Sequence, residues 1–534
     1  MPKNPEAERI IKSYSDLNSE RAPLLSTLQD IADYISPRKN MILSKRSTGT
    51  KSPVMLYDST AEHAAILLAN SLQGAFAMSW FSQRYADEEL NEDEESVLWL
   101  DEAVKRMYRA INKSNLSTEG HEAILDVVVL ATGCLLIEEK ALEKKGFNGL
   151  RFKAFAIDEY VIDENAEGFV DTVIRNVSFT ARQAVQEYGD KAGKEALMSV
   201  KKEPYRMIKY LRAAFPSKES NYKIPDKFKY ADITVSENEG EIIKKSGYHE
   251  FPYAVPRWSK VSNEKYGRGP GETALSFAKG LNKTREEFLK ALAIDLNPPL
   301  LTPETVGKLK RLPGSQNNVR HDLVDKIKPL PTNARHDVVQ YSIADERQAI
   351  KEIFFTDQLQ MQKKAQMTAT ESTITFELME RLLGPTYGRL SIELFEPIVN
   401  RVFGLMLRSG ALGVPPKITH GRAVDVEYVG PLARAQKQSE IQGINSLVTL
   451  ITSMQGSFPN VVDALNADKA VKNSAKAFGV AEEILNSDEA IAETRKKRAD
   501  AEDAAQQQQA LIEGAKAFPN VAKSLNALKM GGGM

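Results

Sequence analysis

The chain has 534 residues, of which 42% are hydrophobic and 27% are charged. Its length predicts about three or four domains around a sizeable buried core. Every apolar run is shorter than the roughly eighteen residues that a transmembrane helix needs, and the first residues lack the apolar stretch of a secretory signal. We therefore expect neither a membrane span nor a signal peptide.

The positive and negative charges balance, with 71 Lys and Arg against 72 Asp and Glu. A protein that grips nucleic acid over a large surface usually carries an excess of basic residues, because neutralising phosphates drives that binding. The balance predicts that any contact with DNA is loose or confined to a few positions.

Cys134 is the single cysteine and lies in an apolar run. One cysteine excludes an intramolecular disulfide and a cysteine-based zinc site, and it fits a reducing compartment. With no basic neighbour to lower its pKa, Cys134 is expected to be a buried structural thiol.

The first 179 residues read as helices followed by a small antiparallel sheet. Asp58 or Ser59 is expected to cap a helix, and the alternation of apolar and polar residues after Cys134 is typical of strands. The helices are predicted at 5–36, with a break near Asn18, and at 64–78, 94–112 and 117–132.

A helix capped by Thr180 is predicted at 180–200, and it precedes an alternating, proline-punctuated stretch at 203–256. We interpret this stretch as a compact α/β insertion between two helices. The second of these helices, 271–297, starts after a Gly/Pro turn and ends at Pro298-Pro299.

The helix 271–297 is expected to be a pillar packed beside copies of itself. At about 1.5 Å per residue it would be roughly 40 Å long. Its large apolar residues form only a partial stripe, which leaves other sides for neighbours to cover. The residues assigned to this packing are Leu275, Leu281, Phe288 and Leu292.

Short strands are predicted at 299–341. The triplets Arg320-His321-Asp322 and Arg335-His336-Asp337 in this stretch are interpreted as polar residues of a hairpin or of an interface. A helix at 342–361, a polar break at 362–370, a helix at 371–410 and a strand at 424–429 follow. The last third is expected to be helical and contains a repeated Phe-Pro-Asn-Val segment at Phe458 and Phe518.

Catalytic signatures are missing from the sequence. It contains no P-loop, no H-E-x-x-H, no G-x-S-x-G and no EF-hand spacing. Gly267 to Gly271 lies at a helix start, but Pro270 removes an amide that a phosphate cradle would use, so a structural turn is favoured. We expect no enzyme activity, cofactor or metal.

Several segments, taken in order, resemble the head-to-tail connector or portal proteins of short-tailed bacteriophages. The resemblance extends to about residue 450. The segments that carry it are Leu56 to Ala61, Ala131-Thr132-Gly133, Ile157 to Tyr160 with Gly168 and Arg175, Pro256-Arg257-Trp258, Tyr266 to Gly271, Pro298-Pro299, Met367 to Glu371 and Gly430 to Ala435.

The resemblance implies an α+β, predominantly helical subunit of a ring of twelve copies, with a wing, two stem helices, a clip between them and a crown. The implied parts are a first wing part (1–179), a first stem helix (180–202), a clip (203–256), a second stem helix (257–298), a second wing part (299–429) and a crown with a possible C-terminal barrel and a flexible tail (430–534).

The resemblance also implies a channel for double-stranded DNA during packaging and ejection. A loop near 360–371 would project into it, and its candidate DNA-contacting residues are Gln362, Lys363, Lys364 and Gln366. Implied partners are the terminase large subunit, scaffolding and major capsid proteins, and tail adaptor or tail tube proteins. The ring would assemble in the bacterial cytoplasm and occupy one capsid vertex.

Two other classes of protein stay open at this point. One is a monomeric or small-oligomer adaptor that binds nucleic acid, which sizing by light scattering would separate from a ring. The other is an enzyme of unfamiliar type, which the missing site chemistry disfavours.

Overall fold

A computed structural model describes most of the chain up to residue 432 and short helical pieces beyond it. The residues that it describes are 4–39, 41–43, 54–73, 81–87, 90, 93–140, 146–219, 227–311, 314–331, 335–357, 383–417, 424–428, 443, 446–454, 471, 491 and 493–501. Residues 1–432 and 433–534 form two separate compact units.

The N-terminal residues form one helix, α1 (Pro5–Ile35), followed by a 3-10 turn, η1 (Pro37–Lys39). The predicted break near Asn18 is wrong. The helix continues because both of its halves are packed: Ala7 and Ile10 lie in one hydrophobic core and Leu28 and Ile31 in another. Tertiary packing thus overrides the weak helix propensity of Asn18.

Three further helices follow: α2 (Thr60–Gln73), α3 (Glu94–Asn112) and α4 (Leu116–Leu130). These positions confirm the helices predicted over 94–112 and 117–132. Of the two predicted caps, Ser59 holds the position before α2, and Asp58 accepts a hydrogen bond from the amide of Thr60. Residues 74–78, the predicted end of the second helix, lie outside the described residues. Cys134 is fully buried, as predicted.

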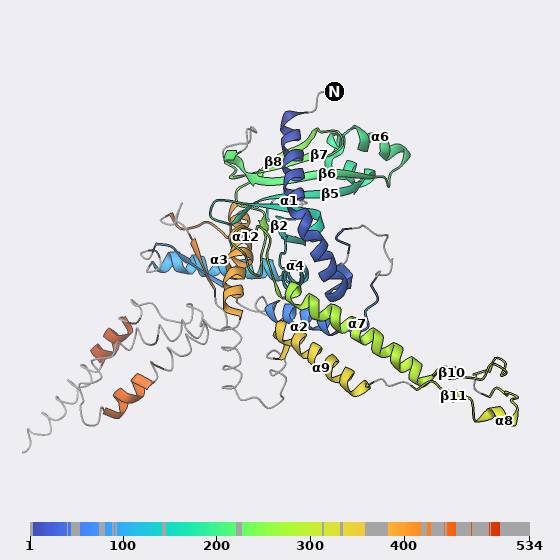
Figure 1. Cartoon of the computed structure of the whole chain (residues 1–534). Helices are drawn as coiled ribbons and strands as arrows, with labels where there is room; N and C mark the ends of the chain where they lie inside the picture. The colour runs from blue at the N-terminus through green and yellow to red at the C-terminus, as the bar shows by residue number, and fades with distance from the viewer. Residues whose placement is uncertain are drawn as a thin grey trace, which may run out of the picture. The chain divides into compact units, whose positions relative to one another are not determined.

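The largest sheet has five antiparallel strands in the order β4-β5-β6-β7-β8. One face is covered by α1, and the other packs partly on α5 and α6 and partly on the main core (Figure 1). The strands are β4 (Tyr160–Glu164), β5 (Val170–Thr180), β6 (Met207–Pro216), β7 (Tyr230–Ser236) and β8 (Ile242–Tyr248), with the 3-10 turns η4 (Ile157–Glu159) and η6 (Ser217–Glu219) beside them.

Two predictions for this region are wrong. The single helix at 180–200 is instead α5 (Ala181–Tyr188), η5 (Gly189–Lys191) and α6 (Lys194–Lys202). Gly189 and Gly193 interrupt it with φ of 58° and 95°, values that favour glycine. The stretch 203–256 is not a separate insertion, because β6 pairs with β5 along residues 173–180 in one continuous sheet.

The smaller sheets are a three-stranded sheet of order β3-β2-β9 and two strand pairs, β1 with β12 and β10 with β11. Their strands are β1 (Phe81–Tyr85), β2 (Leu135–Glu139), β3 (Leu150–Ala154), β9 (Tyr253–Ala254), β10 (Leu300–Leu301), β11 (Lys328–Pro329) and β12 (Val424–Tyr428).

The long helix predicted at 271–297 is confirmed as α7 (Pro270–Leu296). After it come α8 (His321–Val324) and α9 (His336–Ile353), so the helix predicted to start at 342 starts earlier. A π-helical turn, η8 (Ser391–Phe395), leads into α12 (Glu396–Arg408), whose first turn holds Pro397. In the C-terminal unit, residues 446–454 and 493–501 are helical.

Candidate functional site

The helices α7 and α9 run side by side in opposite directions, and the residues between them extend from their far ends (Figure 1). His336 at the start of α9 contacts Asp295 near the end of α7, and its ring meets Phe288 edge-on at a centroid distance of 5.6 Å. Near the middle of α7, Gly280 lies close to the Glu346 carboxylate, where a side chain at position 280 would have little room.

The apolar stripe of α7 packs inside its own subunit. Leu281 and Phe288 are 2% and 6% exposed in the main core, and Leu275 and Leu292 pack against it. Other apolar residues on the same helix stay exposed: Phe277 and Leu289 at 40%, Ile294 at 44% and Leu296 at 86%. The faces of α7 that do not pack in the core therefore expose apolar side chains. Exposed apolar surface of this kind is typical of a contact with a neighbouring molecule.

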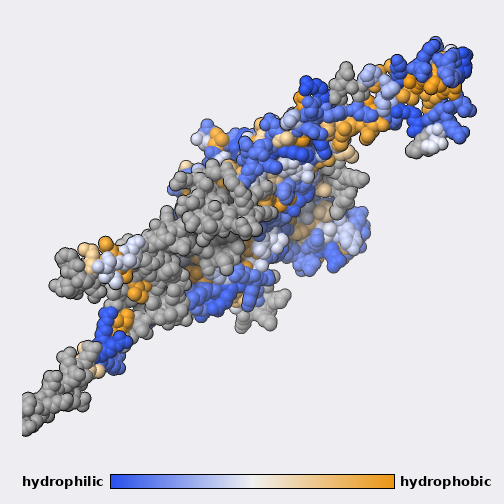
Figure 2. Space-filling model, turned by 90° about the horizontal axis from the view of Figure 1, so that it is seen from below, coloured by the Kyte–Doolittle hydropathy of each residue, from blue (hydrophilic) through white to orange (hydrophobic). Residues whose placement is uncertain are grey.

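Residues 297–335, which we call the excursion, join α7 to α9. None of its described residues is buried, and Leu301, Val324 and Leu330 are 52%, 52% and 43% exposed. Figure 2 shows hydrophobic side chains among hydrophilic ones along the arm that α7 and the excursion form. Both Arg-His-Asp triplets make local ion pairs, Arg320 with Asp322 at 2.7 Å and Arg335 with Asp337 at 3.4 Å.

Asp58, just before α2, links that helix to Arg347 in the second half of α9. Its carboxylate, 4% exposed, receives Arg347 Nε at 3.0 Å as well as the Thr60 amide and hydroxyl. Burial disfavours the ionised carboxylate, but the bonds from Thr60 and Arg347 outweigh it and hold the pKa of Asp58 below its usual value of 3.8.

A lowered carboxyl pKa predicts a defined dependence of stability on pH. Its contribution is present above the unfolded pKa and is lost as pH falls through the folded value. We expect Asp58→Asn, which keeps an acceptor for the Thr60 amide but removes the charge, to lower the unfolding temperature at neutral pH and to approach the wild type as the pH falls below 3.8 and through the lower folded pKa. Thermal unfolding measured over this pH range tests it. Asp337→Asn, in an exposed pair, is the control, and a difference that stays constant with pH contradicts the prediction.

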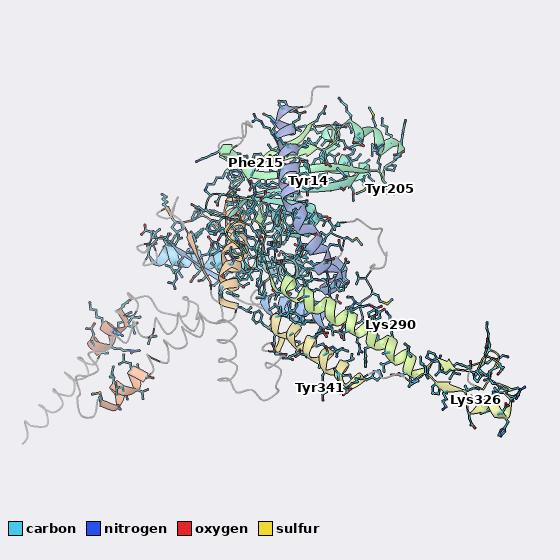
Figure 3. The ribbon with its side chains drawn as sticks, viewed as in Figure 1. Tyr14, Tyr205, Phe215, Lys290, Lys326 and Tyr341 are labelled. Atoms are coloured by element: carbon cyan, nitrogen blue, oxygen red, sulfur yellow. The ribbon has the colours of Figure 1, made fainter. Side chains whose placement is uncertain are left out.

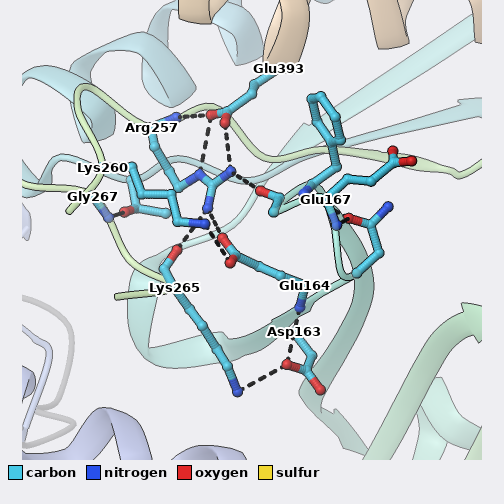
Figure 4. A network of polar contacts seen from close by, with 12 residues as sticks. Asp163, Glu164, Glu167, Arg257, Lys260, Lys265, Gly267 and Glu393 are labelled. Carbon is cyan, nitrogen blue, oxygen red and sulfur yellow. Dashed lines mark hydrogen bonds and ion pairs between the residues drawn. The ribbon is translucent and has the colours of Figure 1, made fainter. Parts of the chain in front are cut away.

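The segment that leads into α7 lies beside a cluster of polar contacts, which we call the join, centred on Arg257, whose side chain is 0% exposed (Figure 4). Its guanidinium donates to Glu393 at 2.5 Å and 3.2 Å, to Glu164, and to the carbonyl oxygens of Lys265 and Gly168 at 3.0 Å and 3.1 Å. Burial disfavours the charge, but Glu393 and Glu164 outweigh it and raise the pKa of Arg257.

The join connects three distant pieces of chain: the β4-β5 hairpin, the segment after β9 and the turn η8. Glu164 ends β4, Gly168 lies in the turn to β5, Arg257 follows β9, and Glu393 lies in the π-helical turn η8. A second cluster joins the five-stranded sheet to β2, where Arg212 contacts Asp232 at 2.9 Å and Glu138 at 2.8 Å. These ion pairs link the five-stranded sheet to β2, to the segment before α7 and, through Glu393, to η8.

Two glycines at the start of α7 allow close approach of the backbone of α4 and the residue after it. A Cβ at Gly267 would lie 2.2 Å from the Ala131 carbonyl oxygen, and one at Gly271 would lie 2.0 Å from that of Val129. The Trp258 amide donates to Ala131 at 2.9 Å, and the Gly267 amide to the Thr132 hydroxyl at 2.9 Å. The structural turn expected for this segment is confirmed.

Several of the segments that carry the family resemblance therefore meet in space. Ala131 to Gly133, Pro256 to Trp258, Tyr266 to Gly271 and Gly168 all border the join, although up to 135 residues separate bonded partners. Sequence reasoning identified these segments but missed Glu393, because nothing in a helical stretch marks a glutamate that will be buried against a distant arginine.

The predicted DNA-contacting residues Gln362, Lys363, Lys364 and Gln366 lie outside the described residues, as does the segment Met367 to Glu371. Within the described part of the chain, no helix is both long and apolar enough to cross a membrane. No three His, Cys, Asp or Glu side chains gather as a metal site there.

Comparison with known proteins identifies the class. Residues 7–485 match the family described as bacteriophage head to tail connecting protein. The chain is 27% identical to the portal protein of Salmonella phage epsilon15 over 502 residues, covering 90% of this chain and 88% of that protein. It is 26% identical to the probable portal protein of Bordetella phage BPP-1, covering 91% and 89%.

Two solved structures also match. One is the neck of an empty gene transfer agent particle, with a TM-score of 0.37 and 12% identity, covering 72% of this chain and 86% of that one. The other is the virion of a native gene transfer agent particle, with a TM-score of 0.36 and 11% identity, covering 78% and 89%.

The chain belongs to the family of bacteriophage head to tail connecting proteins, as the sequence segments indicated. Its function is accordingly structural: it is a portal protein of the virion, at the vertex where head and tail meet. The expected mixed helical and strand architecture is confirmed for the subunit.

Proposed function

We propose that twelve copies of this chain close into a ring at one capsid vertex, with a central channel through which double-stranded DNA enters during packaging and leaves during ejection. The family membership supports this role, and the exposed apolar residues on α7 are the observation that carries the ring. In a closed ring each subunit offers two different faces to its neighbours, which would cover those residues.

We assign the two stem helices to α7 and α9, with the excursion as the clip between them. The resemblance implies two channel-lining helices with a clip between, and this antiparallel pair with its connecting segment fits that order. The earlier assignment of 180–202 and 203–256 to a stem helix and a clip loses its basis, because these residues form short helices and strands of one sheet.

The ring would dock the packaging terminase and later the tail adaptor, and it would hold no catalytic site of its own. Scaffolding and capsid proteins would contact it at the vertex. A near-zero net charge supports a channel that lets DNA pass, because each neutralised phosphate adds salt-dependent grip.

Light scattering on the purified protein tests the ring. We expect particles of about twelve subunit masses, in keeping with the closed symmetry of such assemblies. A stable monomer at all concentrations and salts would favour the alternative, an adaptor that binds nucleic acid as a single subunit.

The loop near 360–371 is the proposed tunnel loop, with Lys363 and Lys364 in transient contact with phosphate. We expect Lys363→Ala combined with Lys364→Ala to leave ring assembly intact and to lower the amount of DNA packaged, because lost cations weaken phosphate contact. The readout is DNA per particle with rings counted by electron microscopy. Unchanged packaging would remove the assignment of this loop.

A further inference from the structure

Positive charge is concentrated in the excursion. Residues 297–335 contain seven Lys and Arg but three Asp and Glu, a net charge of +4, whereas the whole chain carries −1. Figure 3 shows Lys326 of this segment beyond the far end of α7, which carries Lys290. The net positive charge of the arm therefore lies in the excursion and not on α7.

Most cations of the excursion are uncompensated. Arg320 and Arg335 pair with Asp322 and Asp337. The remaining cations are exposed and make no ion pair with another described residue; they are Lys308, Lys310, Arg311, Lys326 and Lys328. Such cations are available to an external anion.

The helix α7 is different. It carries four basic and four acidic residues, and each of its lysines is paired. Lys279 meets Asp30 at 2.6 Å, Lys283 meets Glu287 at 2.7 Å, and Lys290 meets Glu286 at 2.6 Å. A helix with its charges paired in this way offers little net attraction to a polyanion that slides past it.

The composition of the excursion favours phosphate over an acidic protein as the anion. It contains no Phe, Trp, Tyr or Met, whereas protein interfaces are enriched in these residues and depleted of lysine. Lysines suit phosphate groups as point charges, and without aromatic residues there is no surface for stacking bases. The chemistry fits the backbone of a duplex, contacted independently of its sequence.

We propose that the unpaired cations of the excursion contact the phosphate backbone of duplex DNA, while the paired surface of α7 does not. This inference rests on the proposed function and adds a second place of contact with DNA, at the clip, to the proposed tunnel loop. In a ring, each cation is repeated around the axis, so a few residues per subunit provide many contacts. DNA would slide along the helices and be held where it passes the excursion.

The test compares two triple variants of the full chain with equal changes in net charge. One, the excursion variant, carries Lys308→Gln, Lys310→Gln and Lys326→Gln. The other, the matched control, carries Lys279→Gln, Lys283→Gln and Lys290→Gln. Binding of a fluorescent linear duplex of random sequence is measured by anisotropy between about 50 and 200 mM salt, where phosphate contacts weaken steeply.

We expect the excursion variant to bind at least about tenfold more weakly at 150 mM salt, with the slope of log K against log salt reduced by roughly three or more. The control should bind within about twofold of the wild type. Wild-type affinity in the excursion variant overturns the inference and is the result expected if the excursion meets an acidic protein. Equal losses in both variants also overturn it.

The same samples separate this inference from the proposed function. Light scattering reports whether each protein forms rings. Absence of rings in the wild type would remove the proposed function, yet the comparison between the two variants would still decide where the chain contacts phosphate.

Discussion

Replacing Arg257 with methionine is expected to destabilise the first unit by about 3 kcal/mol, because it leaves Glu393 and Glu164 buried without their main partner. This loss of stability is at the lower end of the range for a broken buried ion pair. The reason is that Arg389 still contacts Glu393 at 3.0 Å and Lys260 still contacts Glu164 at 2.6 Å. Urea unfolding followed by circular dichroism measures it.

Two further variants sharpen this test. Arg268→Met removes an exposed arginine paired with Glu264 and Glu272, and should cost under about 1 kcal/mol. Adding Glu393→Met to Arg257→Met removes a stranded carboxylate and should recover part of the loss. If Arg257→Met unfolds at the same urea concentration as Arg268→Met, the join contributes nothing to stability.

The second large effect is expected at Leu281, which lies 2% exposed in the main core. Leu281→Asp removes an apolar side chain and buries a charge without a designated partner, and each change alone costs several kcal/mol, roughly 2–5 for the lost side chain. We expect the variant to be insoluble or unfolded, as judged by circular dichroism and proteolysis.

The matched variant is Leu289→Asp on the same helix, where the side chain is 40% exposed. It should keep the fold of the subunit and lose ring assembly, because the charge falls on a side that a neighbouring copy would cover. Normal rings from Leu281→Asp would mean that α7 packs differently. Unfolding of Leu289→Asp would mean that this face of α7, too, packs inside the subunit.

Local signals allowed much of the fold to be predicted. The helix α7 was predictable because Pro270 and Pro298 bound a run of good helix formers, and α3 and α4 because their apolar periods are clear. Each of these elements is specified by residues within it, so no knowledge of distant contacts was needed.

The errors arose where distant contacts override local preference. Asn18 looks like a break, yet α1 continues because two cores hold its ends. The residues 180–200 read as one helix, yet Gly189 and Gly193 adopt positive φ that the apolar pattern does not reveal. The pairing of β6 with β5 joins segments separated by two helices. The sequence alone therefore could not show that the predicted domain boundary at residue 203 falls inside one sheet.

In the candidate site, too, local features were predictable and long-range contacts were not. The segments around Arg257 could be selected by resemblance, but their convergence depends on contacts between residues 89 to 136 positions apart. The stripe of Leu275, Leu281, Phe288 and Leu292 was identified correctly as apolar, but only the structure shows that the subunit itself covers it.

The unbroken course of α1 has a mechanical consequence. At 31 residues it is about 45 Å long. It begins on the five-stranded sheet and ends against α4 and α7 in the main core (Figure 1). One helix thus links the sheet to the start of α7, and Pro23, which removes a backbone hydrogen bond inside it, is the position where it would bend most easily. A displacement of the sheet would therefore reach α7 through this helix rather than through a loop.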